Sequence, residues 1–145
     1  MGSFLHWNCR GIKTNRNELK DLIFKYQPDV FCIQETHLKN KDNFNLSTYS
    51  VIRMDNPDQS HHSKGGVAVF IKNSIHFNIL NLNSCFQVAA VKVYLNKLIT
   101  VCSIYLPPGV IFNSNNFEDL INQLPRPFIL LGDFNAHNPV GFYEN

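Results

Sequence analysis

The sequence has few cysteines, and their spacing does not suit a zinc site. Its 145 residues include four cysteines, and no two of them form a C-x-x-C pair. Three of the four lie in or beside apolar stretches that are typical of strands. Because the sequence also shows no signal-peptide pattern, it predicts reduced thiols in an intracellular protein. The pair His61-His62 lies in a polar segment that is more typical of a loop than of a metal site.

Long hydrophobic runs and a strong net charge are also missing. No apolar run approaches the roughly 18 residues that a membrane-spanning helix requires, so we expect a soluble protein with no transmembrane segment. The net charge of +2 is weak for a protein that binds DNA, because such proteins normally concentrate basic residues on one surface. Any contact with DNA would therefore depend on local basic patches.

The chain contains no internal repeat, low-complexity tract or linker. A content of 44% hydrophobic and 17% charged residues is typical of a globular protein. The length and composition therefore predict one domain over residues 1–145. Apolar runs predict strands at Phe4–Trp7, Asp29–Ile33, Val67–Ile71, Ile75–Leu80, Gln87–Leu95, Leu98–Ile104 and Phe128–Leu131.

The connections between these runs predict an α/β fold. Asn15 and Glu18 resemble a capping box, followed by an amphipathic helix that Pro28 closes before the second strand. Residues 39–63 form a long polar loop with one short strand at 49–52. We expect residues 75–80 to pair back on 67–71 as a hairpin, and a second hairpin to turn at Asn96-Lys97. Residues 117–124 predict a short second helix.

The segment Gly132-Asp133-Phe134-Asn135 directly follows the apolar run 128–131, which reads as a buried strand. Gly132 would let the chain turn, and the side chains of Asp133 and Asn135 could then point the same way. A carboxylate can bind a hard cation or accept a proton, and an amide can donate to a phosphoryl oxygen. The alternative is an ordinary strand and turn, since Asp and Asn are favoured turn residues.

Other predicted strands end in the same manner, at Asn8, at Gln34-Glu35 and at Tyr105. Loops beyond the carboxyl ends of strands form the usual ligand crevice of layered α/β folds, so these ends could converge on one site. Its residues would be Asn8, Glu35, Tyr105, Asp133 and Asn135. Two acids, two amides and a phenol suit a divalent cation and a phosphate, with Glu35 holding the metal. Basic residues also follow two of these strand ends, Lys13 and Arg16 after Asn8 and Lys39 and Lys41 after Glu35, and each could equally be a solvated loop residue.

Five blocks along the chain resemble the endonuclease/exonuclease/phosphatase superfamily, and within it the endonuclease domain of jockey-type non-LTR retrotransposons. They are Trp7-Asn8-Cys9-Arg10-Gly11, Gln34-Glu35-Thr36-His37-Leu38, Gly65-Gly66-Val67-Ala68-Val69, Ser103-Ile104-Tyr105-Leu106-Pro107-Pro108 and Gly132-Asp133-Phe134-Asn135-Ala136-His137. The resemblance implies a four-layer α/β sandwich. It also implies a Mg²⁺-dependent nuclease, with Mn²⁺ as a possible substitute, that nicks DNA and so primes the element's reverse transcriptase.

The resemblance also implies a role for each residue of the rim. Glu35 corresponds to the principal metal ligand, and Asn8 to a second contact with metal or phosphate. Tyr105 corresponds to a contact with the scissile phosphate, and Asp133 to the group that orients or deprotonates the attacking water. Asn135 corresponds to a donor to the transition state. Arg10 would contact phosphate or pair with a loop acid. The implied partner is DNA, and a reverse transcriptase domain could follow in the parent element, whose activity would be nuclear.

The chain departs from the family pattern after Val140. Family members continue to a Ser-Asp-His segment that this sequence lacks, so we expect the C-terminal part of the second half of the fold to be missing and an apolar sheet face to be left open. The alternative to an active nuclease is a catalytically inactive retroelement fragment that binds nucleic acid or protein. A phosphatase for small phosphorylated molecules is a further reading of the same fold.

Overall fold

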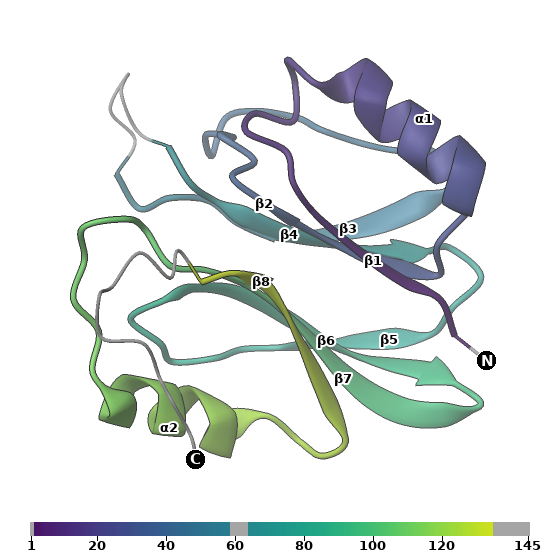
Figure 1. Cartoon of the computed structure of the whole chain (residues 1–145). Coiled ribbons are helices and arrows are strands. Elements are labelled where there is room, and N and C mark those ends of the chain that lie inside the picture. Colours follow the sequence, from purple (N-terminus) through teal and green to yellow (C-terminus); the bar gives the residue numbers. More distant parts are fainter. Residues whose placement is uncertain (1, 59–63, 135–145) are drawn as a thin grey trace, which may run out of the picture.

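In the computed structural model, which describes residues 2–58 and 64–134, two β-sheets pack face to face between two helices (Figure 1). One sheet has the strand order β1-β2-β4-β3 and the other has the order β5-β6-β7-β8. Helix α1 covers the outer face of the first sheet, and helix α2 covers the outer face of the second (Figure 1). The predicted four-layer α/β sandwich is therefore the architecture of the described residues.

The first sheet contains the predicted β-α-β unit. Strand β1 (Phe4–Asn8) leads through α1 (Arg16–Tyr26) to β2 (Val30–Gln34), and β1 pairs with β2 in parallel. Strand β4 (Val67–Lys72) pairs antiparallel with both β2 and β3 (Tyr49–Met54). Strand β3 extends the strand predicted within the polar loop by two residues. The parallel pairing places the carboxyl ends of β1 and β2 at the same edge of the sheet.

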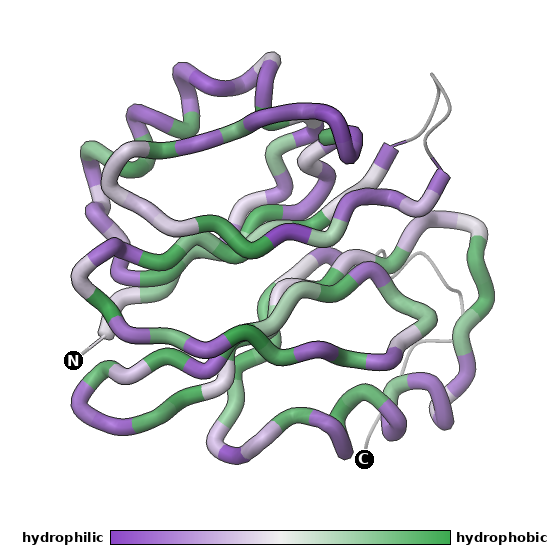
Figure 2. The backbone as a smooth tube through the Cα atoms, turned by 180° about the vertical axis from the view of Figure 1, so that it is seen from behind, coloured by the Kyte–Doolittle hydropathy of each residue, from purple (hydrophilic) through white to green (hydrophobic). Residues whose placement is uncertain are grey.

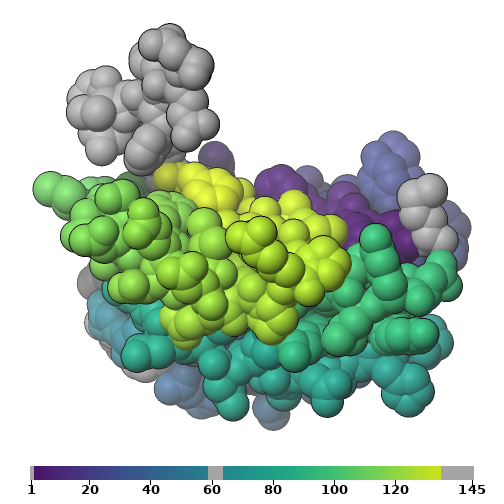
Figure 3. Space-filling model, turned by 90° about the horizontal axis from the view of Figure 1, so that it is seen from below, coloured from purple at the N-terminus to yellow at the C-terminus, as the bar shows by residue number. Residues whose placement is uncertain are grey.

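The second sheet is built in the same manner. Strands β6 (Gln87–Leu95) and β7 (Lys97–Tyr105) form the predicted hairpin. The chain then passes through α2 (Ser114–Gln123) to β8 (Phe128–Asp133), which pairs with β7 in parallel. Strand β5 (Phe77–Leu80) completes this sheet on its other side. Each sheet therefore contains one parallel pair, and β1 contacts β8 across the sandwich (Figure 3).

Three apolar clusters hold the layers together. One lies between α1 and the first sheet, one between the two sheets, and one between the second sheet and α2. Figure 2 shows the matching concentration of hydrophobic residues in the strands. The expectation that an apolar sheet face is left open is wrong for the described strands, because Leu120 and Leu124 pack on the outer face of the second sheet.

The hairpin predicted between residues 67–71 and 75–80 does not form. Both edges of β4 are already paired, with β2 and with β3. The turn after β4 instead carries the chain to the other sheet, where β5 pairs with β6. An apolar strand can pair with any free edge, so the short turn alone did not determine its partner.

The capping box predicted for α1 is also absent. The side chain of Asn15 makes no cap hydrogen bond and instead donates to the carbonyl of Cys9 at 2.6 Å. A reciprocal capping box occurs at α2, where Asn113 accepts from the amide of Asn116 and the side chain of Asn116 accepts from the amide of Asn113. An amide at the third helical position thus takes the role that Glu usually has.

Gly132 does not form the predicted turn, because it lies within β8. A Cβ atom at this position would lie 1.9 Å from the carbonyl oxygen of Ile104. Glycine is thus required by the close approach of β8 to β7 rather than by a turn. Nor is β8 fully buried as predicted. All of its residues are partly exposed, since no described strand pairs with its second edge.

The cysteines are free thiols, in agreement with the sequence-based prediction. Cys9, Cys32 and Cys102 are buried, and burial raises the pKa of Cys9 and of Cys102 to about 12. These thiols therefore stay protonated at neutral pH and are poor nucleophiles. None of the helices in the described ranges is long and apolar enough to cross a membrane.

Candidate active site

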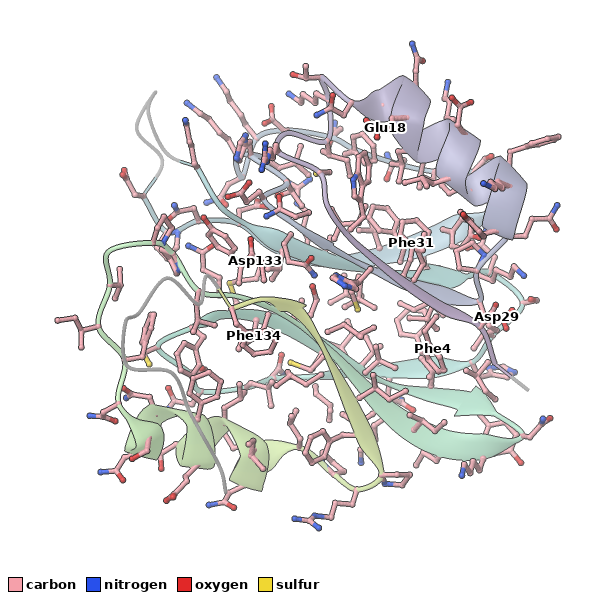
Figure 4. All side chains as sticks on the ribbon, viewed as in Figure 1. Phe4, Glu18, Asp29, Phe31, Asp133 and Phe134 are labelled. Atoms are coloured by element: carbon pink, nitrogen blue, oxygen red, sulfur yellow. The ribbon has the colours of Figure 1, made fainter. Side chains whose placement is uncertain are left out.

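Four of the five residues predicted to form the site lie together at one end of the sandwich. Asn8 ends β1, Glu35 directly follows β2, Tyr105 ends β7 and Asp133 ends β8. The register pairs Asn8 with Gln34 in one sheet and Tyr105 with Asp133 in the other. Figure 4 shows Asp133 between the sheets at this end and Asp29 at the opposite end. The fifth residue, Asn135, lies outside the described residues.

Two side-chain hydrogen bonds connect the sheets at this end. The amide nitrogen of Asn8 donates to Oδ2 of Asp133 at 2.6 Å, which joins β1 to β8. The hydroxyl of Tyr105 donates to Oε1 of Glu35 at 2.9 Å, which joins β7 to the end of β2. Hydrogen bonds to ionised carboxylates are stronger than those between neutral groups, so both acids are oriented by their partners. The hypothesis that these strand ends converge is confirmed by this geometry.

Glu35 is held in an uncommon backbone conformation. Its φ of 54° and the φ of 53° at His37 lie in the left-handed region, which non-glycine residues seldom occupy. The intervening Thr36 donates its amide to the carbonyl of Gly66, and His37 donates to the carbonyl of Gly65. Strain of this kind persists where neighbouring groups impose it, and it is concentrated at functional sites. These bonds therefore fix the direction in which the Glu35 carboxylate leaves β2.

Gln87 is a supporting residue that our sequence analysis missed. Its Oε1 accepts from the amide of Gly66 at 2.6 Å, and the side chain is buried. Gly65 also approaches Gln87 so closely that a Cβ would lie 2.7 Å from Oε1. The available signal was a polar residue directly before the apolar run 88–91, since a buried amide is usually retained only with hydrogen-bond partners.

The loop after β1 packs on the loop that carries Glu35. Gly11 donates its amide to the carbonyl of Glu35 at 2.8 Å, and Ile12 donates to the carbonyl of Thr36 at 3.0 Å. Arg10 has a φ of 47°, and its amide donates to Oδ1 of Asn8 at 3.3 Å. The side chain of Arg10 is exposed, and it forms no ion pair within the described ranges. Its guanidinium is therefore available to an anionic ligand.

His37, Lys13 and Arg16 contribute less to the site than their proximity in sequence suggested. Burial lowers the pKa of His37, although the nearby Glu35 carboxylate opposes this shift. Lys13 forms an ion pair with Asp42 at 2.6 Å, and Arg16 lies over the ring of Phe44. Both of these cations are thus engaged within the protein, so Arg10 is the better candidate for a phosphate contact.

Residues 5–144 match the Endonuclease/Exonuclease/phosphatase family. The chain belongs to this family. The four residues at the strand ends therefore lie in a member of a family of nucleases and phosphatases. The family that we assigned from five sequence blocks is confirmed.

Retrotransposon proteins are among the relatives of this family member. It is 30% identical over 133 residues to the RNA-directed DNA polymerase from mobile element jockey of Drosophila melanogaster. It is 29% identical over 135 residues to the probable RNA-directed DNA polymerase from transposon X-element of the same species. These matches cover 90% and 91% of the chain but only 14% and 15% of the relatives. The chain thus corresponds to a small part of each relative's length.

Solved structures of nucleases have the same fold. An AP endonuclease from Archaeoglobus fulgidus matches 96% of this chain with a TM-score of 0.64 and 18% identity, over 60% of its own length. A 3′ phosphatase from Neisseria, bound to a product DNA hairpin, matches 93% with a TM-score of 0.62 and 19% identity, over 58% of its length. At these identities the likeness supports the fold alone.

Proposed function

We propose that this chain is the endonuclease part of a non-LTR retrotransposon protein, and that it nicks one strand of DNA with the help of Mg²⁺. The nick would expose a 3′ hydroxyl from which a reverse transcriptase in the parent protein extends, and this activity would take place in the nucleus. The observation that carries the proposal is the pair of cross-sheet contacts, Tyr105 to Glu35 and Asn8 to Asp133, in a chain of the nuclease family. We further propose that residues 1–145 act as one domain.

The side chains at the site fit a hard divalent cation. Magnesium is usually held by one or two carboxylates, together with water and substrate phosphate, rather than by a cage of protein ligands. Residues 2–58 and 64–134 contain no cluster of three or more His, Cys, Asp or Glu side chains that could hold a metal ion. Glu35 would hold the ion, and Oδ1 of Asn8 would provide a second oxygen. A bound ion would offset the charge that develops on the phosphate.

Tyr105 and Asp133 would act on the phosphate and on water. The Tyr105 hydroxyl orients Glu35 in the free protein, and the same hydroxyl would contact a non-bridging phosphate oxygen in the complex. Asp133, which accepts a hydrogen bond from Asn8, would orient the attacking water and accept its proton. Positioning of this kind can supply several kcal/mol of the barrier reduction.

Arg10 and Asn135 would complete the polar surround of the phosphate. The exposed guanidinium of Arg10 matches the geometry of a phosphate group, to which it can donate two parallel hydrogen bonds. Asn135 follows Asp133 by two residues, and its amide would donate to the phosphate as charge increases in the transition state.

Nicking of supercoiled plasmid by the purified chain tests this function. We expect Mg²⁺-dependent conversion to open circles, a lower rate by at least about 100-fold in Glu35→Ala and Asp133→Ala, and polymerase extension from the nick. Glu18→Ala is the matched control, because Glu18 is an exposed acid on α1, away from the site (Figure 4). A wild-type rate no higher than that of the two site variants would refute the proposal and favour the inactive fragment that binds nucleic acid or protein.

A further inference from the structure

A layer of polar side chains lies directly beneath the candidate site, between the two sheets. Side chains alternate along a strand, so the residue two positions before a site residue faces the same side. Ser103 precedes Tyr105 in this way. His6 precedes Asn8 on the edge strand β1, where it is exposed, and the equivalent position before Asp133 is the apolar Leu131. Gln34 lies beside Ser103 and His6, on β2, where the next inward-facing residues, Cys32 and Val30, belong to the apolar cluster between the sheets. On β2, Gln34 therefore lies between these apolar residues and the strand end that leads to Glu35.

Gln34 and Ser103 form the centre of this layer and are both fully buried, with 0% of each residue exposed. Nε2 of Gln34 donates to Oγ of Ser103 at 3.1 Å, which connects β2 to β7. Oγ of Ser103 lies 3.3 Å from the carbonyl oxygen of Ile33, to which it donates. Nδ1 of His6 lies 3.5 Å from Oε1 of Gln34. The Ser103 hydroxyl thus donates a hydrogen bond to the main-chain carbonyl of Ile33 and accepts one from Gln34.

This bond constrains the sheets in a way that apolar packing does not. Contacts between aliphatic side chains are non-directional, so they tolerate small displacements of one sheet relative to the other. A buried amide that loses its partner is left with an unsatisfied donor in an apolar setting, so the Gln34–Ser103 bond strongly favours one offset of β2 against β7. Glu35 is the next residue after Gln34, and Tyr105 is two residues after Ser103. That offset consequently sets the distance between the Glu35 carboxylate and the Tyr105 hydroxyl.

We propose that Gln34 and Ser103 are a positioning pair, which fixes the relative placement of the two sheets and thereby the hydrogen bond from Tyr105 to Glu35. Their contribution to catalysis rests on the proposed nuclease function, but their effect on Tyr105 does not. Neither residue reaches the site itself, and both act through the backbone of the strands that carry Glu35 and Tyr105.

Fluorine NMR of the chain labelled with 3-fluorotyrosine reads the environment of Tyr105 without any need for activity. The chain contains five tyrosines, and Tyr105→Phe assigns the resonance by its loss. Glu35→Ala gives the resonance position of Tyr105 without its hydrogen-bond partner. In Gln34→Met, which keeps side-chain length but removes the amide, and in Ser103→Ala, we expect the resonance to move toward that position.

Two further variants separate positioning from a loss of stability. Val101→Ala truncates a fully buried side chain in the same strand and the same inter-sheet cluster but leaves the Gln34–Ser103 hydrogen bond in place. We therefore expect the Tyr105 resonance not to move toward its position in Glu35→Ala. Ser103→Thr keeps the hydroxyl, and we expect it to restore the wild-type resonance. Thermal unfolding of each variant shows that the comparison is made on folded protein. If Gln34→Met does not fold, the resonance of Ser103→Ala alone decides whether the pair positions Tyr105.

Kinetics then link the pair to nicking. We expect Gln34→Met and Ser103→Ala to lower kcat by about 10- to 100-fold with little change in KM, because DNA still binds while the reacting groups are misplaced. The double variant should be no slower than the slower single variant, since both remove the same bond. An unmoved Tyr105 resonance in both folded variants would overturn the proposal. A wild-type chain that does not nick DNA would refute the proposed function only, because the resonance test would still stand.

Discussion

Gly132 is the residue whose substitution tests the packing of β8 most directly. A Cβ added there would lie 1.9 Å from the carbonyl oxygen of Ile104, and 2.8 Å from its carbonyl carbon. The shortest ordinary contact between carbon and a carbonyl oxygen is about 3.3 Å, so relief requires a displacement of about 1.4 Å. The atom it would meet first belongs to the backbone of β7, which cannot rotate away as a side chain can. Gly132→Ala must therefore move β8 away from β7.

The expected cost follows from that displacement. Hydrogen bonds between the two strands near Gly132 would lengthen beyond the usual range, and we expect two of them to be lost at about 1 kcal/mol each. Overpacking adds about 1–3 kcal/mol. The total of about 3–5 kcal/mol is a large part of the 5–15 kcal/mol that stabilises a typical small protein. Because Asp133 is the next residue, nicking should fall together with stability.

Urea unfolding measures this cost, with the fluorescence of Trp7, the sole tryptophan, as the probe. Gly2→Ala is the matched control. A Cβ at Gly2 would lie 2.5 Å from Cδ1 of Leu95, but this atom ends a flexible side chain that can rotate. We expect the control to change the free energy of unfolding by less than about 0.5 kcal/mol. A cost of less than about 1 kcal/mol for Gly132→Ala would refute the reasoning from close approach.

Three further substitutions give independent tests. Tyr105→Phe removes the hydroxyl that orients Glu35, so we expect nicking to fall by about 10- to 100-fold with a loss of stability of about 1 kcal/mol, measured on the same protein sample. Burial works to raise the pKa of Asp29, but hydrogen bonds from Ser3 and Lys72 outweigh it and hold the pKa below the ordinary 3.8. Ionised Asp29 therefore stabilises the fold above pH 3.8, and this contribution fades as the pH falls below that value. Unfolding of the wild type and of Asp29→Asn between about pH 2 and 6 should give stabilities that converge at the acid end, and a constant difference would contradict this. Asn113→Ala breaks the capping box of α2 and should lower the free energy of unfolding by about 1 kcal/mol, seen as a lower urea midpoint with an unchanged slope.

Much of the fold could be predicted because its signals are local. Apolar runs identify the strands, and the helix between the first two strands predicts their parallel pairing. Parallel pairing then determines that Asn8 and Glu35 emerge at one edge, and the same argument brings Tyr105 and Asp133 together. Strand direction alone thus predicts that each pair of site residues meets at one edge of its own sheet.

The features that could not be predicted depend on contacts distant in sequence. Strand β5 pairs with β6 rather than with its neighbour β4 because both edges of β4 are occupied by other strands. Asn15 donates to the carbonyl of Cys9 rather than capping α1, which depends on where the preceding loop lies. The sequence around Gly132 suggests a turn. The actual reason for glycine is the Ile104 carbonyl beside it, which belongs to another strand and cannot be inferred from the local sequence.

The site itself shows the same division between local and distant causes. The sequence places one polar group at each strand end, but it does not specify how far apart the two sheets hold those groups. That spacing comes from bonds across the sandwich: Asn8 to Asp133, Tyr105 to Glu35, and Gln34 to Ser103 beneath them. Each joins a residue of the first sheet or the loop after it to a residue of the second, and the partners are 69 to 125 residues apart in sequence. The site therefore exists only when the sheets are docked, and its geometry is a property of the sandwich rather than of any one motif.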